Sequence, residues 1–165
     1  MQIQGIPGDV DFISKVRTLP NAVIHVINGI LSPVDIQHLT HHGLKMLILG
    51  YKDLGRGHDF LSGSGSAVSE LQQWLYDILP KMLHMGWFQL VSFDNLAIEQ
   101  LGVRRLLTDG EWREFYMGND GSYTFYIDMV AGTFARNSLS QERYDIGMKS
   151  IDEMFKIIRK YEKAS

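Results

Sequence analysis

The sequence of 165 residues contains no cysteine. A chain without thiols cannot form disulfides, offer a thiolate nucleophile or bind zinc through sulfur. It also cannot ligate an iron–sulfur cluster through cysteine, so such a cluster within this chain is excluded.

The sequence also lacks an excess of positive charge and a long hydrophobic run. Sixteen lysines and arginines stand against nineteen acidic residues, which gives a formal net charge of -3. This balance argues against direct binding to nucleic acid or anionic lipid. No apolar run approaches the roughly 20 residues of a membrane span. Residues 1–12 have neither the basic nor the apolar region of a signal peptide. We therefore expect a cytoplasmic protein without a membrane partner.

What is present has the composition of a folded globular protein. Hydrophobic residues make up 45% of the chain and charged residues 21%, which excludes a wholly disordered or fibrous chain. The length predicts a single domain, 1–165, with a main body at about 1–107 and an extension at about 108–165.

Two short apolar runs, 22–27 and 44–49, are typical of buried parallel strands covered on both faces. His25 lies inside the first run and is expected to be a core histidine. Between the runs, Ser32 and Pro33 predict a helix start, and Gly43 predicts its end. Strand, helix and strand together indicate a βαβ unit.

A second βαβ unit follows from the next part of the chain. Residues 50–65 are rich in glycine and are expected to be irregular, with a mobile second half. From residue 66 the apolar spacing is helical, and Pro80 predicts a kink or a break. A third strand is expected at 87–92, followed by a short helix at 96–101.

The extension at about 108–165 also contains sequence patterns that predict secondary structure. Thr108 and Glu111 match a capping box at the start of a helix, and 123–130 with 133–136 indicate an antiparallel hairpin. Ser150 is expected to cap a final helix. The fold class is therefore α/β, with about three parallel strands, flanking helices, and a C-terminal β-hairpin and helix.

Ligands of parallel α/β folds bind beyond the carboxyl ends of the strands. The candidate ligand-binding residues at the three predicted ends are Asn28, Gly29, Gly50, Tyr51, Lys52, Gly55, Arg56, Gly57, Asp94 and Asn95. In the middle group the glycines allow close backbone approach, and two cations could favour an anion. The loop matches no phosphate-binding motif, so a glycine-rich turn with two solvated cations is an equal alternative. Asp128 near the hairpin turn is a further candidate, although an aspartate there caps a turn just as often.

Three histidines near the end of the first helix, His38, His41 and His42, have a spacing that could bring two of them to a metal. Histidines at a helix C-terminus are also favoured by the helix dipole. No carboxylate completes a metal motif beside them. We therefore expect no metal and keep these residues as weak candidates.

Five segments together resemble the C-terminal half of radical S-adenosylmethionine proteins of the kind often carried in phage and prophage genomes. They are HVINGI (25–30), LKMLILGYKDLGRG (44–57), FDNLAIEQL (93–101), FYMGNDGSYTFYID (115–128) and FARNSLSQERY (134–144). The resemblance implies a partial parallel β/α barrel, a half barrel whose strands correspond to the fifth and sixth of the family. It implies that Asn28 and Gly29 approach an adenosyl group and that Gly50, Tyr51 and Lys52 lie beside adenine.

The family binds its cluster through a CxxxCxxC loop, which this chain lacks, so a stand-alone radical reaction is excluded. A half barrel exposes a sheet edge and apolar surface that its own extension, a second copy or a partner must cover. We therefore expect a non-catalytic binding protein with a protein partner or a homodimer. A concrete version is a phage-encoded inhibitor of a host defence system, of the anti-CRISPR type. The alternatives are a subunit of a split radical S-adenosylmethionine enzyme, or a small domain that binds a nucleotide or S-adenosylmethionine as its cofactor through residues 50–57.

Overall fold

The computed structural model describes residues 10–162, so most of the N-terminal segment considered above lies outside it. The chain forms two compact units, Met1–Thr108 and Asp109–Ser165, which we call the N-terminal unit and the C-terminal unit. Each unit has its own sheet and its own hydrophobic core. They are described separately.

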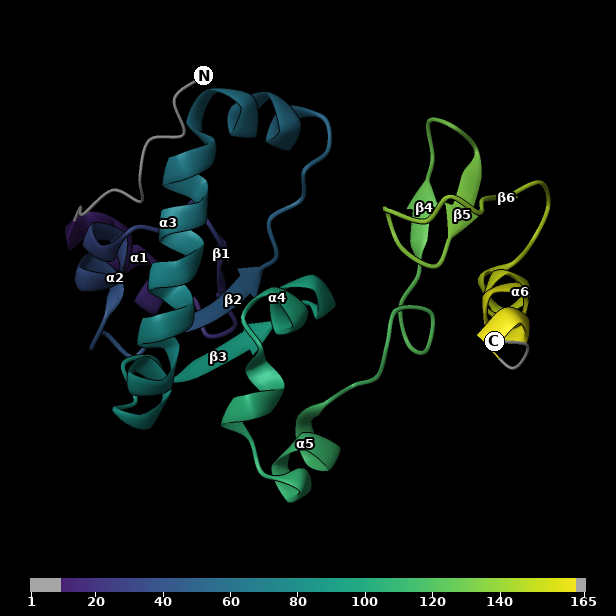
Figure 1. Ribbon diagram of the computed structural model, residues 1–165. Helices are drawn as coiled ribbons and strands as arrows, with labels where there is room; N and C mark the ends of the chain where they lie inside the picture. The colour runs from purple at the N-terminus through teal and green to yellow at the C-terminus, as the bar shows by residue number, and fades with distance from the viewer. Residues whose placement is uncertain (1–9, 163–165) are drawn as a thin grey trace. The chain divides into compact units, whose positions relative to one another are not determined.

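The N-terminal unit alternates helices and strands (Figure 1). Its elements are α1 (Val10–Arg17), β1 (Ile24–Ile27), α2 (Pro33–Leu39), β2 (Lys45–Leu49), α3 (Arg56–His84), β3 (Leu90–Phe93), α4 (Asn95–Gln100) and the 3-10 helix η1 (Val103–Leu106). The three strands are parallel and lie in the order β1-β2-β3. This confirms the predicted α/β class and the three parallel strands. The described residues form an open sheet and not a closed barrel.

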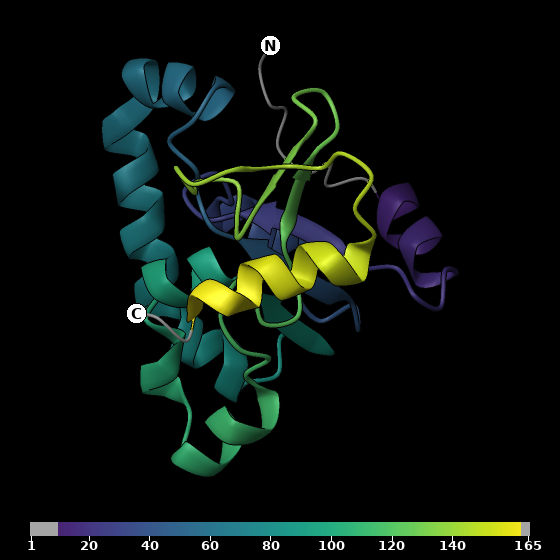
Figure 2. The same cartoon turned by 90° about the vertical axis from the view of Figure 1, so that its right-hand side faces the viewer.

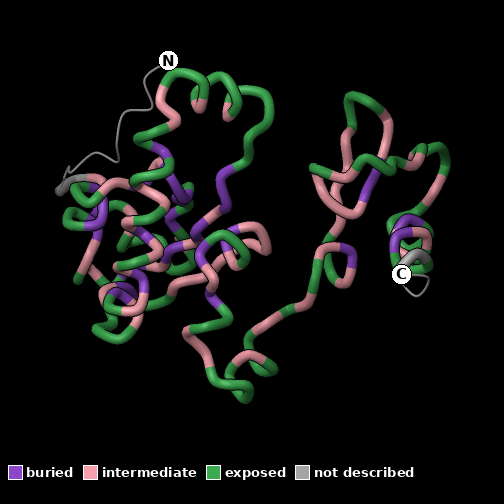
Figure 3. The backbone as a smooth tube through the Cα atoms, viewed as in Figure 1, coloured by how far each residue is buried: buried purple, intermediate pink, exposed green. Residues whose placement is uncertain are grey.

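One face of the parallel sheet forms the core. The buried stretches of the chain are purple in Figure 3. Ile24 and Val26 of β1 pair in register with Met46 and Ile48 of β2, and all four are buried. They belong to one hydrophobic cluster with side chains from α2 and α3, the helices that precede and follow β2 in the chain. The helical members that are buried are Ile36, Leu39, Leu75, Leu79 and Met82.

The other face of the same sheet is not buried. His25 and Ile27 alternate with the core residues of β1 and are exposed, and Leu90 of β3 is 50% exposed. The prediction that the first strand is covered on both faces is therefore wrong, as is the prediction of a core histidine at position 25. The run of apolar residues misled the prediction because Ile27 is apolar without being buried.

Helix α3 begins at Arg56 and passes through the glycine-serine stretch, so the predicted irregular segment at 56–65 is wrong. Of the kink or break expected at Pro80, the break is wrong, because the helix continues through Pro80 and its non-helical residue is Ser64. A proline at position 80 leaves the carbonyl of Tyr76 without its helical donor. Arg105 supplies that donor from outside the helix, with a hydrogen bond of 2.8 Å to the Tyr76 carbonyl oxygen.

The C-terminal unit contains α5 (Asp109–Phe115), β4 (Tyr126–Asp128), β5 (Thr133–Ala135), β6 (Tyr144–Asp145) and α6 (Ile151–Glu162) (Figure 2). β4 and β5 form the predicted antiparallel hairpin, and β6 adds a strand that the sequence did not indicate. The core cluster of this unit is built on three buried side chains, Phe134, Met154 and Ile158. Among residues 10–162, no helix has the length and apolarity needed to cross a membrane.

Candidate ligand-binding site

The carboxyl ends of the three parallel strands meet at one edge of the sheet, as the sequence predicted. Asn28 follows β1 and donates from its backbone to the carbonyl of Leu49, at 2.9 Å. Asp94 follows β3 and donates from its backbone to the carbonyl of Ile48, at 3.1 Å. The sheet ladder thus continues beyond the strands and fixes the loops that follow them.

Asp94 ties the end of β2 to the start of α4. Its Oδ1 accepts hydrogen bonds from the backbone N–H of Gly50 at 2.9 Å and of Ala97 at 2.7 Å. The second bond is an N-cap, which is the structural alternative for an aspartate at a strand end. Asn95, the first residue of α4, is not among the residues that line the pocket described below.

Gln100 links all of these elements, although nothing in its sequence context singled it out. Its Oε1 accepts from the Asn28 Nδ2 at 3.0 Å and from the Tyr51 N–H at 2.9 Å, while its Nε2 donates to the Tyr51 carbonyl at 2.9 Å. The two bonds to Tyr51 fix which end of the Gln100 amide faces Asn28. Asn28 must therefore present its NH₂ group.

This arrangement leaves one buried acceptor unsatisfied. Asn28 is 1% exposed, and within the described residues its Oδ1 has no hydrogen-bond partner. A flip of the amide would satisfy nothing, because it would bring Oδ1 against Oε1 of Gln100. An orphaned polar atom of this kind is rare in a folded interior.

The glycines of this edge are explained by packing within the chain. A Cβ at Gly50 would lie 2.8 Å from the backbone nitrogen of Ala97, and a Cβ at Gly57 would collide with the carbonyl oxygen of Lys52. Gly55 has a φ of 51° at the N-cap of α3, which side chains rarely adopt. Gly29 is buried beneath α3, where its nearest neighbours are Val68 and Gln72.

Tyr51 closes the loop between β2 and α3. Its hydroxyl donates to the Gly57 carbonyl at 2.6 Å, and the side chain is only 8% exposed. Burial of the hydroxyl, followed by the nearby charge of Asp53, raises the pKa of Tyr51. The phenol therefore stays neutral and serves as a structural donor.

A pocket of about 370 Å³ lies at this edge. It is lined by Ile27, Ile30, Leu49, Gly50, Tyr51, Lys52, Arg56, Gly57, Phe60 and Asp94. Six of the predicted site residues are among them, and Asn28, Gly29, Gly55, Asn95 and Asp128 are not. The sequence missed the apolar members because Ile27, Ile30 and Leu49 could not be distinguished from core residues.

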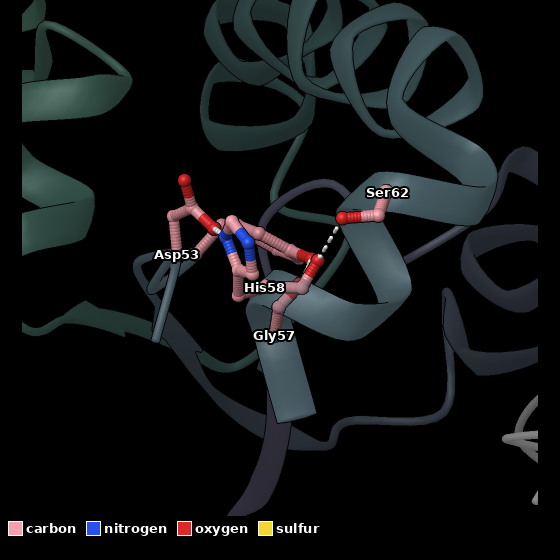
Figure 4. Close-up of polar contacts among 5 residues, drawn as sticks. Asp53, Gly57, His58 and Ser62 are labelled. Carbon is pink, nitrogen blue, oxygen red and sulfur yellow. Dashed lines mark hydrogen bonds and ion pairs between the residues drawn. The ribbon is translucent and has the colours of Figure 1, made fainter. Parts of the chain in front are cut away.

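Beside the pocket, Asp53, His58 and Ser62 bring three types of side chain found in hydrolytic triads into one region (Figure 4). The His58 Nδ1 lies 2.9 Å from the Asp53 Oδ1. Ser62, however, donates to the backbone carbonyl of His58 at 3.0 Å and not to the imidazole. Since a serine nucleophile needs the ring nitrogen as its base, these residues do not form a catalytic triad.

The remaining candidates lie elsewhere. Helix α2 ends at Leu39, before the predicted stop, and His41 has a φ of 63°. In the described part of the chain, no three His, Asp or Glu side chains come together as a metal group, and this includes His38 and His42. Asp128 belongs to the C-terminal unit, where its Oδ1 accepts from the backbone of Val130 and Ala131.

The polar side chains of this edge, Asp94 and Gln100, hold backbone groups, and its cations, Lys52 and Arg56, are exposed. Such an arrangement can bind a ligand. Comparison with known proteins adds no assignment: no family model, no curated protein and no solved structure matches the chain.

Proposed function

We propose that this chain is a non-catalytic binding protein and that a protein partner covers the uncovered face of its parallel sheet. The observation that carries the proposal is the exposure of Ile27 and Leu90, at 39% and 50%, on that face. Parallel sheets occur almost only with both faces covered. A partner that buries this face would complete the layer that the N-terminal unit lacks.

A half barrel is consistent with the strand order behind this face. In a β/α barrel each strand pairs with the next along the chain, and one half of a doubly wound sheet has the same order. Here the order is β1-β2-β3, and both β1 and β2 direct their buried residues toward the same helix-covered core. The opposite face would then correspond to a barrel interior, and its residues are apolar at 27, 47, 49 and 90 and polar at 25, 45 and 92.

The test is a photo-crosslinking amino acid placed at Leu90, with Val34 as the matched control. Val34 is an apolar residue of α2 in the same unit and is 58% exposed. We expect an intermolecular cross-link from position 90 and none from position 34. Cross-linking from both positions alike, or only within one chain, would overturn the proposal.

The identified partner is then purified and its affinity measured with two charge variants. Leu90→Glu should weaken binding by about tenfold or more, because a charge would be buried at an apolar contact, whereas Val34→Glu should leave it unchanged. Equal affinities of the two variants would contradict the assigned surface.

The identity of the partner separates the specific versions of this function. A defence nuclease that the purified chain inhibits would support the phage-inhibitor version. A chain that carries CxxxCxxC and gains radical activity on mixing would make this protein an enzyme subunit, and the non-catalytic proposal would fall. A second copy of the chain would establish a homodimer that buries the same face.

A further inference from the structure

We propose that the pocket at the carboxyl edge of the parallel sheet binds an organic anion that carries a flat apolar group. This inference is tested separately from the protein partner, and Ile27 belongs both to the pocket lining and to the uncovered face. Its volume of about 370 Å³ lies near the lower end of the range typical of small-molecule sites, roughly 300–1,000 Å³.

The apolar wall of the pocket comes from three different elements of the fold. Ile27 ends β1, Leu49 ends β2, and Phe60 lies in the first turns of α3. Phe60 is 38% exposed, so its ring has surface available for a second flat group. Aromatic pairs are stabilised by about 0.5–1.5 kcal/mol beyond simple burial.

The polar wall favours negative charge. Lys52 and Arg56 both line the pocket and are exposed to solvent. The single carboxylate of the lining belongs to Asp94, whose Oδ1 already accepts two backbone hydrogen bonds. The formal charge of the lining residues is therefore +1, and the nearby Asp53 carboxylate lies 2.9 Å from His58 Nδ1.

The backbone at the start of α3 adds to this preference. The N-cap is Gly55, which has no side chain to accept from the first-turn N–H groups. The Gly57 N–H donates to the Leu54 carbonyl at 3.0 Å, but the positive end of the helix dipole still lies beside Arg56 and Gly57, which line the pocket. An anion held between the two cations would also be close to this end of the helix.

Phenyl phosphate is the probe that combines both parts of the predicted ligand, and benzoate tests whether a carboxylate serves equally well. Binding is followed through the backbone amide NMR signals of Gly50 and Gly57 in the full chain. We expect saturable shifts with phenyl phosphate or benzoate, and affinities at least tenfold weaker for phenol, which lacks the charge, and for inorganic phosphate, which lacks the ring.

The deciding variant is Lys52→Ala with Arg56→Ala. It should lower the affinity for the anionic probe about tenfold or more, while the double variant Lys156→Ala, Lys160→Ala removes the same charge from α6 and should bind normally. Phe60→Ala should weaken the phenyl probes and leave inorganic phosphate unchanged. Circular dichroism confirms that each variant is folded.

Three results would overturn the inference. The first is the absence of shifts up to millimolar probe, and the second is equal affinity of the two charge variants. The third is tighter binding of S-adenosylmethionine, whose sulfonium is cationic, than of either anion. The cross-linking result at Leu90 is a separate readout, so failure of one proposal leaves the other testable.

Discussion

The two units of the chain achieve stability in different ways. The N-terminal unit has a continuous core in which strand residues such as Met46 and Ile48 and helix residues such as Leu75 and Leu79 are fully buried. The core of the C-terminal unit is built on three buried side chains. The smaller unit therefore has a smaller apolar core, in which each buried side chain accounts for a larger share of the burial.

The longest polar contacts of the two units differ in how many positions they span along the chain. In the N-terminal unit the Asn28–Gln100 hydrogen bond joins residues 72 positions apart, and the bond between Gly50 and Asp94 spans 44. In the C-terminal unit the contacts of Ser150 with Glu153 and of Asp128 with Ala131 span three positions, while the hydrogen bond from Arg159 to the Ser122 carbonyl spans 37. Long-range bonds lock a tertiary arrangement, whereas local bonds shape turns that can form without it.

The largest effect is expected from Phe134→Ala. Phe134 is fully buried at the centre of the smaller core, and removal of such a ring costs about 3–5 kcal/mol. Because the C-terminal unit has little other apolar burial, we expect it to unfold while the N-terminal unit stays folded. Amide hydrogen exchange resolved by residue measures both.

The control is Phe115→Ala, which removes a ring of the same unit that is 63% exposed and should change stability little. Simultaneous loss of protection at β1–β3 and at β4–β6 in the Phe134 variant would show that the two units fold as one cooperative body. The conclusion that the two units are stabilised by separate cores would then be wrong.

Gln100→Ala should destabilise the N-terminal unit by about 1–3 kcal/mol, because it removes the partner of the buried Asn28 amide and of the Tyr51 backbone. Chemical denaturation gives the change in the free energy of unfolding. Gln73→Ala is the matched control, since its amide contacts Asp77 on the exposed side of α3. Equal effects of the two variants would mean that the strand-end hydrogen bonds do not hold the site together.

The sequence predicted most of the fold because its signals are local. The apolar runs at 22–27 and 44–49, Ser32 before Pro33, and the alternation around Tyr126 and Ile127 each depend on neighbouring residues. The failures involve contacts between distant residues. Arg105 satisfies the carbonyl that Pro80 leaves free, and no local pattern could reveal that.

The candidate site was predicted in part for the same reason. Parallel strands bring their carboxyl ends together by topology, so Gly50, Lys52 and Asp94 could be assigned to one edge. Gln100 could not, because a glutamine in a short helix carries no signal of the residues it will meet. The apolar wall escaped notice because an isoleucine or leucine has the same sequence pattern in a pocket as in a core.

Ser150→Ala is expected to have a smaller effect than either variant above. Ser150 caps α6, with its Oγ accepting from the Glu153 N–H at 3.3 Å, and loss of such a cap costs about 1 kcal/mol. The loss should appear as faster hydrogen exchange in α6 alone. Ser150→Asp, which keeps a capping oxygen, should restore protection. Unchanged exchange in the alanine variant would mean that the cap does not stabilise the helix.

The smallest expected effect is a loss of stability of the C-terminal unit at acid pH. Hydrogen bonds from the Ser150 backbone and hydroxyl lower the pKa of Glu153 below 4.5. A carboxylate whose pKa is lower in the folded state stabilises the protein above its unfolded pKa, and this contribution is lost as pH falls through the folded value. The C-terminal unit should therefore lose stability below about pH 4.5, as measured by hydrogen exchange of α6 across an acid series.

Glu153→Gln should reduce that pH dependence, although part will remain because Asp128 also has a lowered pKa. Glu142→Gln removes an exposed carboxylate outside the helices and should preserve the dependence. A Glu153→Gln variant with the same acid response as the Glu142 variant would show that the local cap, unlike the buried hydrogen bonds of the other unit, does not contribute to stability.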